Sequence, residues 1–323
     1  MDCREIVRRT LAFEYPARVA RSFEPSDFVV SGPEIPNPLD KWRKINDREW
    51  RRTDEWGNIW GRVDGTSKGQ IIHGILNDLG EVASCPFPDF ANAAYYTHAQ
   101  EIFAGQPDKW HIGSVQGLTF KMAQQLRRFD QYLMDLVTEP RQISRLHDRI
   151  DEQIQYQIKR LHQAGADSIM FWEDWGTQAQ TFISPHLWRV EFKPRFIRLV
   201  AEAHALGLSV IMHSCGKITA ILPDLIECGI DVFQFDQPCI HGIDTLAEMQ
   251  QGRVTFWCPV DIQTTLQSKD EILIRREAGE LLKKLWKGQG GFIAGFYSDE
   301  ESIGLEPCWQ QIASDAFLQQ SVK

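Results

Sequence analysis

From about residue 110 onward, the chain repeats one pattern: an amphipathic helix, a glycine and then a short apolar strand. Apolar residues at helical spacing over 146–161 end at Gly165, and the apolar segment Ser168–Trp172 follows. A second such helix ends at Gly207. The strands that this pattern predicts later in the chain are 208–212, 230–235, 253–260 and 291–297. Their continuously apolar character is typical of a parallel sheet covered by helices.

A long alternation of helix and parallel strand gives either a doubly wound sheet or a (β/α)8 barrel. The doubly wound alternative loses its main support, because no Gly-x-Gly-x-x-Gly motif follows any predicted strand. The sequence therefore predicts the α/β class and a (β/α)8 TIM barrel. Its 323 residues are within the range of one such barrel, so we expect a single domain over 1–323.

The first 65 residues differ from this pattern. A short helix is expected over 3–14, followed by a proline-rich loop and a small hairpin that carries Trp50, Trp56 and Trp60. These tryptophans either pack as part of a covering layer or stack on a ligand, and packing is the favoured interpretation. We expect 1–65 to be a helix and hairpin elaboration that covers the barrel, and the segment from about residue 40 to 65 to help close its mouth.

Charge and composition exclude several classes of partner. The net charge is −9 and no long basic run is present, which argues against binding nucleic acid or a membrane surface. No apolar run reaches membrane-spanning length, and the first residues lack the apolar core of a signal peptide. We therefore expect a cytoplasmic protein whose seven cysteines are reduced. A homodimer is considered as an assembly state.

Polar side chains follow five successive predicted strands. In a barrel of this class, the active site lies at the C-terminal ends of the strands. Such residues are common where a strand leaves the core, but acids, amides, His and Cys at five successive ends favour a functional mouth. The candidate residues at these ends are Glu173, Asp174, Gln178, His213, Cys215, Gln237, Cys239, His241, Asp261, Gln263, Tyr297 and Asp299.

His213 and Cys215 are two residues apart at the end of one strand. Side chains at positions i and i+2 of a strand point the same way, so this pair is expected to face one pocket. The alternatives are half of a metal site or two ordinary core residues, since free cysteine is often buried. Asp174 could be a general base, a substrate anchor or a cap for the turn that follows it.

Several blocks of the sequence resemble the uroporphyrinogen decarboxylase superfamily. These are EYPARV near the N-terminus, FWEDWGTQ followed by ISP, HSCGKI, ECGIDVFQFDQP and CPVDIQ. Their order and spacing make the resemblance more specific than any single block. The resemblance implies a (β/α)8 barrel with its pocket at the C-terminal ends of the strands.

The resemblance implies two different chemistries. True uroporphyrinogen decarboxylases remove carboxyl groups without a cofactor and carry an Arg-Gln-x-Gly-Arg segment for the substrate carboxylates. Here the equivalent region reads PARVARSFEPSD, which retains Arg18 and Arg21 but lacks that pattern. Corrinoid-dependent methyltransferases instead bind zinc through His-x-Cys and a distant Cys near the last strand.

His213 and Cys215 match the first two of these zinc ligands. The distant Cys is missing, because the chain reads Phe296-Tyr297-Ser298-Asp299 where that residue should fall. Asp299 is the expected substitute, and Tyr297, Cys239 and His241 remain alternatives, since zinc accepts oxygen ligands.

The resulting hypothesis is metal-assisted methyl transfer from a small methylated or methoxylated substrate to a corrinoid protein or similar acceptor. Zinc would be the cofactor, and corrinoid would be present only on the separate partner. Asp174 and Asp261 would be catalytic. The expected substrate-binding residues are Glu173, Gln178, Gln237, Gln263 and Tyr297. Two alternatives stay open: cofactor-free decarboxylation of a carboxylated ring, and a barrel that only binds a small molecule.

Overall fold

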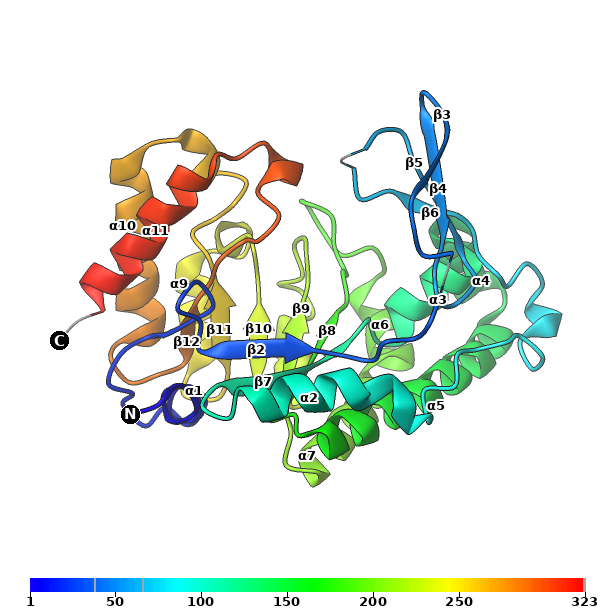
Figure 1. Ribbon diagram of the computed structural model, residues 1–323, viewed down its shortest axis with the longest axis horizontal. Helices are drawn as coiled ribbons and strands as arrows, with labels where there is room; N and C mark the ends of the chain where they lie inside the picture. The colour runs from blue at the N-terminus through cyan, green and yellow to red at the C-terminus, as the bar shows by residue number, and fades with distance from the viewer. Residues whose placement is uncertain (38, 66, 322–323) are drawn as a thin grey trace.

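The protein is described by a computed structural model that covers residues 1–37, 39–65 and 67–321. Its centre is an eight-stranded sheet in which neighbouring strands pair in parallel and wind into a barrel (Figure 1). This arrangement confirms the predicted (β/α)8 class. In spatial order the strands are β2 (Phe28–Ser31), β7 (Trp110–Val115), β8 (Ser168–Trp172), β9 (Ser209–His213), β10 (Val232–Gln234), β11 (Thr255–Cys258), β12 (Phe292–Ala294) and β1 (Ala20–Arg21).

The strands predicted from the apolar segments are all present. The bounds of β8 equal the prediction, and β9 begins and ends one residue later than predicted. Strands β10, β11 and β12 are shorter than the predicted segments, because the chain leaves the sheet at their C-terminal ends to form the loops at the barrel mouth.

Two of the eight strands, β1 and β2, come from the first 31 residues, a segment that the sequence analysis assigned to an elaboration over the barrel. The buried carboxylate of Asp27 joins them. It accepts hydrogen bonds from the Arg18 guanidinium at 2.7 Å and from the backbone N–H of Arg21 at 2.9 Å. The backbone N–H of Asp27 donates to the carbonyl of Arg21 at 3.0 Å. The N-terminal segment therefore helps to close the barrel itself.

The barrel interior is filled by one buried apolar side chain from each strand. Phe28 and Trp257 stack across this interior, with ring centroids 5.0 Å apart. Helix α1 (Cys3–Ala12) adds Ile6 and Val7 to the same cluster and covers the end of the barrel opposite the mouth (Figure 1). The strand residues of the cluster are Ala20, Phe28, Ile112, Met170, Ile211, Val232, Trp257 and Ile293.

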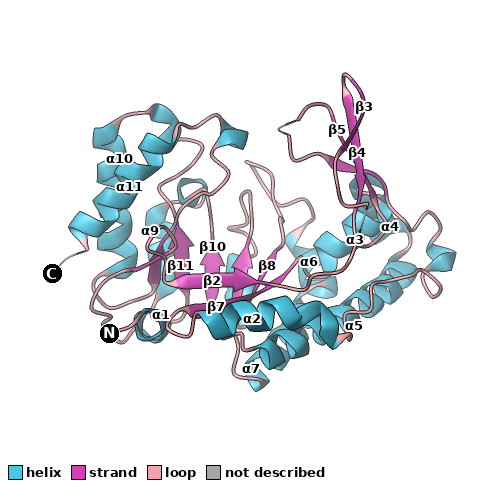
Figure 2. Cartoon of the chain, viewed as in Figure 1, coloured by secondary structure: helices cyan, strands magenta, loops and turns pink. Residues whose placement is uncertain are grey.

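Helices surround the sheet and bury its outer face (Figure 2). Helix α6 begins at Pro185, with Ser184 accepting a hydrogen bond from the backbone N–H of Leu187. The helices after α1 are α2 (Thr97–Gly105), α3 (Thr119–Arg127), α4 (Phe129–Thr138), α5 (Pro140–Ala164), α6 (Pro185–Glu191), α7 (Lys193–Ala205), α8 (Leu222–Glu227), α9 (Ile243–Gln250), α10 (Glu271–Leu281) and α11 (Pro307–Gln320). In the described part of the chain, none of these helices has the length and apolar character needed to cross a bilayer.

A second, antiparallel sheet stands to one side of the barrel mouth (Figure 1). The predicted hairpin is present, with its turn at 54–58, but the sheet has four strands and continues to residue 73. Trp56 packs on Phe87 and Phe90, with centroids 5.3 and 5.2 Å away, and anchors the sheet to the body of the protein. Its strands are β3 (Arg43–Asn46), β4 (Glu49–Thr53), β5 (Ile59–Arg62) and β6 (Gln70–His73).

Candidate metal centre

The ends of β8 and β9 bring together Asp174, His213 and Cys215. One ligand atom from each of these residues lies within 4.8 Å of the other two. The Nε2 atom of His213 is 3.3 Å from the Cys215 Sγ and 3.6 Å from the Asp174 Oδ1. A nitrogen, a sulfur and an oxygen thus converge at one point of the barrel mouth.

Local backbone geometry explains how His213 and Cys215 meet. His213 is the last residue of β9 and projects to the same side as Ile211, which is part of the barrel interior. Gly216 then turns the chain with a φ of +78°, and a Cβ atom there would lie 2.0 Å from the carbonyl oxygen of Gly176. Only glycine allows this approach, which holds the loop after β8 against the loop after β9.

The orientation of the His213 ring is fixed by residues of the neighbouring strand β10. The Nδ1 atom of His213 makes a short hydrogen bond to the Gln234 Oε1. The Gln234 amide nitrogen donates to the Asp236 Oδ1 at 2.7 Å, so its oxygen must face the histidine. Because the amide oxygen only accepts, the proton is on Nδ1 of His213. In the neutral ring the lone pair is then on Nε2, which faces Asp174 and the thiol of Cys215.

Asp174 also determines the position and the protonation of Cys215. Its Oδ1 atom accepts a hydrogen bond from the backbone N–H of Cys215 at 2.8 Å. Although Cys215 lies at the mouth, desolvation by the surrounding protein and then the charge of Asp174 raise the pKa of its thiol to about 12. In the absence of a metal ion, the thiol is thus protonated at neutral pH.

These three residues fit the donor set of a catalytic zinc ion. Zinc bonds of about 2.0 to 2.3 Å in tetrahedral geometry place the ligand atoms about 3.3 to 3.8 Å apart. The measured separations of 3.3 and 3.6 Å fall within this range. Three protein ligands leave the fourth position open for substrate, and the hydrogen bond from His213 to Gln234 is typical of a histidine that binds metal.

Comparison with protein families identifies the chain. The sequence model of the uroporphyrinogen decarboxylase (URO-D) family matches residues 71–296. The chain belongs to the URO-D family. The matched range contains the strand ends of β8 to β11 and every member of the metal cluster. A comparison with curated protein sequences gives no match.

Comparison with solved structures finds a similar fold for this URO-D family member. A methyltransferase from Methanosarcina mazei superposes with a TM-score of 0.62 at 15% sequence identity, covering 79% of this chain and 73% of that one. A GH10 endo-β-1,4-xylanase from Gloeophyllum trabeum has a TM-score of 0.45 at 10% identity, covering 70% of this chain and 80% of that one. At these identities, the first similarity indicates a common barrel fold.

Two residues expected to bind metal or substrate, Asp299 and Tyr297, contact Lys68. Asp299, the expected third ligand, forms an ion pair with Lys68 at 2.9 Å. The Lys68 ammonium also donates to the hydroxyl of Tyr297 at 3.4 Å. Among the described residues, the metal cluster does not include Asp299. Its third member is Asp174, which was expected to be catalytic.

Glu173 and Asp261 are both buried and hydrogen bonded to backbone. Glu173 accepts hydrogen bonds from the N–H groups of Leu118 and Phe120, at 2.6 and 2.8 Å, at the start of helix α3. Asp261 accepts from the N–H groups of Thr264 at 2.9 Å and of Cys239 at 3.2 Å. Both carboxylates therefore hold loops in place, and these bonds do not favour the catalytic role predicted for Asp261.

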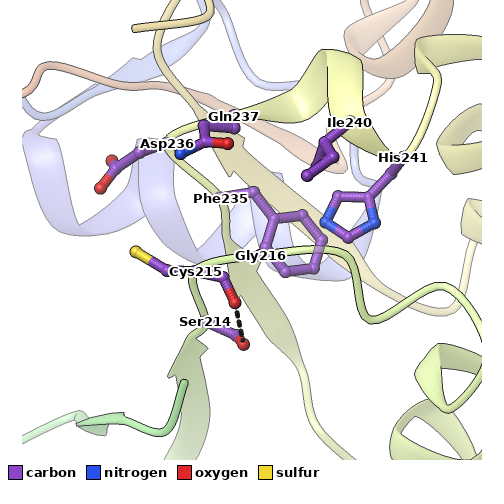
Figure 3. Close-up of a pocket in the computed structure, with 8 residues that line it drawn as sticks. All are labelled: Ser214, Cys215, Gly216, Phe235, Asp236, Gln237, Ile240 and His241. Carbon is purple, nitrogen blue, oxygen red and sulfur yellow. Dashed lines mark hydrogen bonds between the residues drawn. The ribbon is translucent and has the colours of Figure 1, made fainter. Parts of the chain in front are cut away.

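The predicted amide residues and the alternative ligands occupy different surroundings. Gln178 and Gln263 are exposed on loops, whereas Gln237 lines a narrow pocket beside Cys215. Figure 3 shows His241 across this pocket from Cys215, where its ring packs against Phe235. Cys239 donates its thiol proton to Glu277 at 3.4 Å. Neither Cys239 nor His241 belongs to the cluster.

Two residues near the cluster, Gln234 and Lys68, were not singled out from the sequence. Gln234 lies two residues before Asp236 at the end of β10. This spacing would have indicated Gln234 as a site residue once β9 and β10 were taken as neighbours. Lys68 lies in the loop between β5 and β6, close enough for its charge to lower the pKa of Cys215 against the stronger opposing effects. No sequence signal connects Lys68 to the barrel mouth.

Proposed function

We propose that this URO-D family protein transfers a methyl group from a small methylated or methoxylated substrate to an acceptor such as a corrinoid protein. The convergence of Asp174, His213 and Cys215 at the barrel mouth supports the proposal. Zinc held by these residues would supply a Lewis acid or an activated thiolate. The methyl carbon leaves its oxygen or nitrogen, the acceptor provides the electron pair, and the leaving atom takes up a proton.

Each residue of the chain has a defined part in this proposal. His213 presents Nε2, because Gln234 holds the proton on the opposite nitrogen. Asp174 orients Cys215 through its backbone N–H, and its carboxylate is 43% exposed, so it can also carry the proton to the leaving atom. The Lys68 side chain reaches over the mouth and would help to keep water out.

The similarity to the Methanosarcina mazei methyltransferase is compatible with this reaction, and a corrinoid protein is accordingly proposed as the partner. We place Asp261 as a residue that orients the mouth, with Gln237 and Tyr297 near the substrate. The cofactor-free decarboxylase alternative requires arginines that point into the mouth. Instead, Arg18 binds Asp27 before β2, and Arg21 donates to the carbonyl of Pro25 at 2.9 Å.

The test compares zinc content after equal zinc loading and desalting. We expect about one zinc per chain in the wild type and a loss of at least about tenfold in His213→Ala and in Cys215→Ser. Matched controls are His241→Ala and Cys239→Ser, which change the same residue types at the next strand end and should retain zinc.

Equal zinc in all five proteins, or none in the wild type, would contradict the metal centre. Methyl transfer to a corrinoid protein is then measured with the zinc-loaded wild type and the same variants. Conversion of uroporphyrinogen to coproporphyrinogen at about 0.1 per second or more would instead favour decarboxylation, since typical enzymes turn over at about 10 per second. A protein with neither zinc nor turnover would support the barrel that only binds a ligand.

A further inference from the structure

A larger pocket opens between the small antiparallel sheet and the ends of β7 and β8. It contains about 740 Å³ of space outside protein atoms, part of it open to solvent. This is enough for a small organic molecule. The side chains that the argument uses are Arg52, Glu55 and Trp60 from the small sheet and its turn, and Gln116, Lys121 and Trp172 from the barrel.

This pocket begins beside the candidate metal centre. Trp172, which lines it, is the last residue of β8 and pairs in register with His213 of β9. Neighbouring strands lie about 4.8 Å apart. Trp172 and His213 also project to the same side of the sheet, since each lies two residues after a member of the interior cluster, Met170 and Ile211. A ligand in this pocket can therefore present one end to the metal centre.

Most charged groups of the pocket already have partners. Arg52 pairs with Asp40. Asp54 accepts hydrogen bonds from the N–H groups of the turn and, at 2.7 Å, from the Trp60 Nε1.

Two groups of opposite charge form no ion pair in the described part of the chain. No other residue donates a hydrogen bond to the Glu55 carboxylate, which is half-buried near Asp54 and Asp40. The Lys121 ammonium forms no ion pair there, although its charge acts on the buried Glu173. A half-buried carboxylate without an ion-pair partner favours a cationic ligand, and an ammonium without one favours an anionic ligand.

The aromatic rings point to the kind of cation. Trp172 is half-buried, packs against the interior cluster of the barrel and lines the pocket. Trp60 has the Arg52 guanidinium over its ring, 4.7 Å from the centroid. Tryptophan rings that line the same pocket as a carboxylate are an environment that binds methylated ammonium groups.

We propose that this pocket binds a small methylated ammonium compound that also carries a carboxylate. Its ammonium group lies against Trp172 and Glu55, and its carboxylate reaches Lys121. The assignment rests on the proposed methyl transfer, because it names the substrate class of that same site. It favours a methylated amine over a methoxylated compound.

Calorimetric titration of the wild-type protein with three probes tests the proposal. Trimethylammonioacetate carries both charges, 3,3-dimethylbutanoate replaces its nitrogen by carbon, and choline lacks the carboxylate. We expect trimethylammonioacetate to bind at least about tenfold more tightly than 3,3-dimethylbutanoate, because only the former places a cation at the ring and the carboxylate. Equal affinities for these two isosteric probes would overturn the proposal, without reference to any variant.

Variants then separate the two charges. Glu55→Gln should weaken both ammonium probes by about tenfold and leave 3,3-dimethylbutanoate unchanged, and Lys121→Met should weaken the two carboxylates but not choline. Glu49→Gln is the matched control, since Glu49 lies on the same sheet but is bonded to Arg51 and Asn46. Unchanged ammonium binding in Glu55→Gln would overturn the assignment.

The failure of this inference can be told apart from the failure of the proposed function. The zinc-depleted His213→Ala protein should still bind trimethylammonioacetate, because neither Glu55 nor Lys121 belongs to the metal cluster. Probe binding without zinc or methyl transfer would support the pocket and remove the proposed function. Methyl transfer from a methoxylated substrate without probe binding would overturn the pocket and keep the function.

Discussion

The barrel mouth and the small antiparallel sheet hold their polar side chains in different ways. At the mouth, His213, Gln234 and Asp236 are at most 9% exposed and are linked by hydrogen bonds between neighbouring strands. On the small sheet, strand β3 is exposed along its whole length, and the other strands are only partly buried. Burial therefore fixes geometry at the mouth, whereas the small sheet relies on contacts between its own side chains.

Those contacts on the small sheet are stacked arginines and tryptophans. The Arg62 guanidinium lies 4.3 Å from the centroid of the Trp42 ring and 5.1 Å from that of Trp50. The Arg52 guanidinium lies between Trp42 and Trp60, at 5.4 and 4.7 Å. Contacts of this kind contribute about 0.5 to 1 kcal/mol each at exposed sites. The barrel mouth is thus a rigid centre for chemistry, and the small sheet is a separate, less buried layer for recognition.

The largest effect should come from removing a ring of the barrel interior. Trp257→Ala leaves a cavity beside Phe28 and should lower the free energy of unfolding by about 3 to 5 kcal/mol. The matched change on the small sheet, Trp50→Ala, should cost about 1 kcal/mol or less, because that ring is half-buried. Urea unfolding of both variants measures the difference, and equal losses would break the comparison.

A second effect concerns the support of His213 by the neighbouring strand. Gln234→Leu removes the acceptor that holds the proton on Nδ1 and should weaken zinc binding by about 10-fold to 100-fold. Competition with a chelating dye measures this affinity. Gln237→Leu is the control, since Gln237 follows the same strand but is not bonded to His213. If both variants bind zinc as the wild type does, the hydrogen bond does not support the metal centre.

A third prediction concerns pH. The pKa of Cys215 is raised to about 12, so the thiol remains protonated between pH 6 and 8 and must lose its proton when zinc binds. The apparent zinc affinity should therefore rise by about tenfold for each pH unit across this range. The slope should be absent in Cys215→Ser and unchanged in Cys239→Ser. A flat profile for the wild type would show that Cys215 does not bind zinc as a thiolate.

The smallest effect is expected where the two regions touch. Lys68→Ala removes the ion pair with Asp299. The Lys68 side chain is 67% exposed and the Asp299 side chain is 41% exposed. The free energy of unfolding should change by less than about 1 kcal/mol, because exposed ion pairs contribute little. Cleavage between β5 and β6 by a protease should nevertheless become faster. Lys44→Ala is the control, since Lys44 pairs with Asp47 inside the hairpin; equal cleavage rates in both would show that Lys68 does not tether the sheet.

Most of the barrel could be predicted from the sequence because its signals are local. An apolar segment bounded by a helix and a polar turn predicts a buried parallel strand, and β8 appears at the predicted residues. The two-residue strand β1 gave no such signal, since it is too short to show periodicity. Strand β1 pairs with β12, and the paired residues Ala20 and Ile293 are far apart in the sequence. The same limit applies to the small sheet, whose hairpin of β4 and β5 was predicted but whose outer strands β3 and β6 were not.

The barrel class could be inferred from the sequence alone, as could the common direction of His213 and Cys215, because side chains alternate along a single strand. The surroundings of that pair depend on how distant segments pack in the folded protein. This packing brought Asp174 from the end of β8 and Gln234 from β10 to the histidine, and it paired Asp299 with Lys68. Side-chain direction follows from the backbone of one segment. The register between strands and the path of a long loop depend instead on packing between segments that are distant in the sequence.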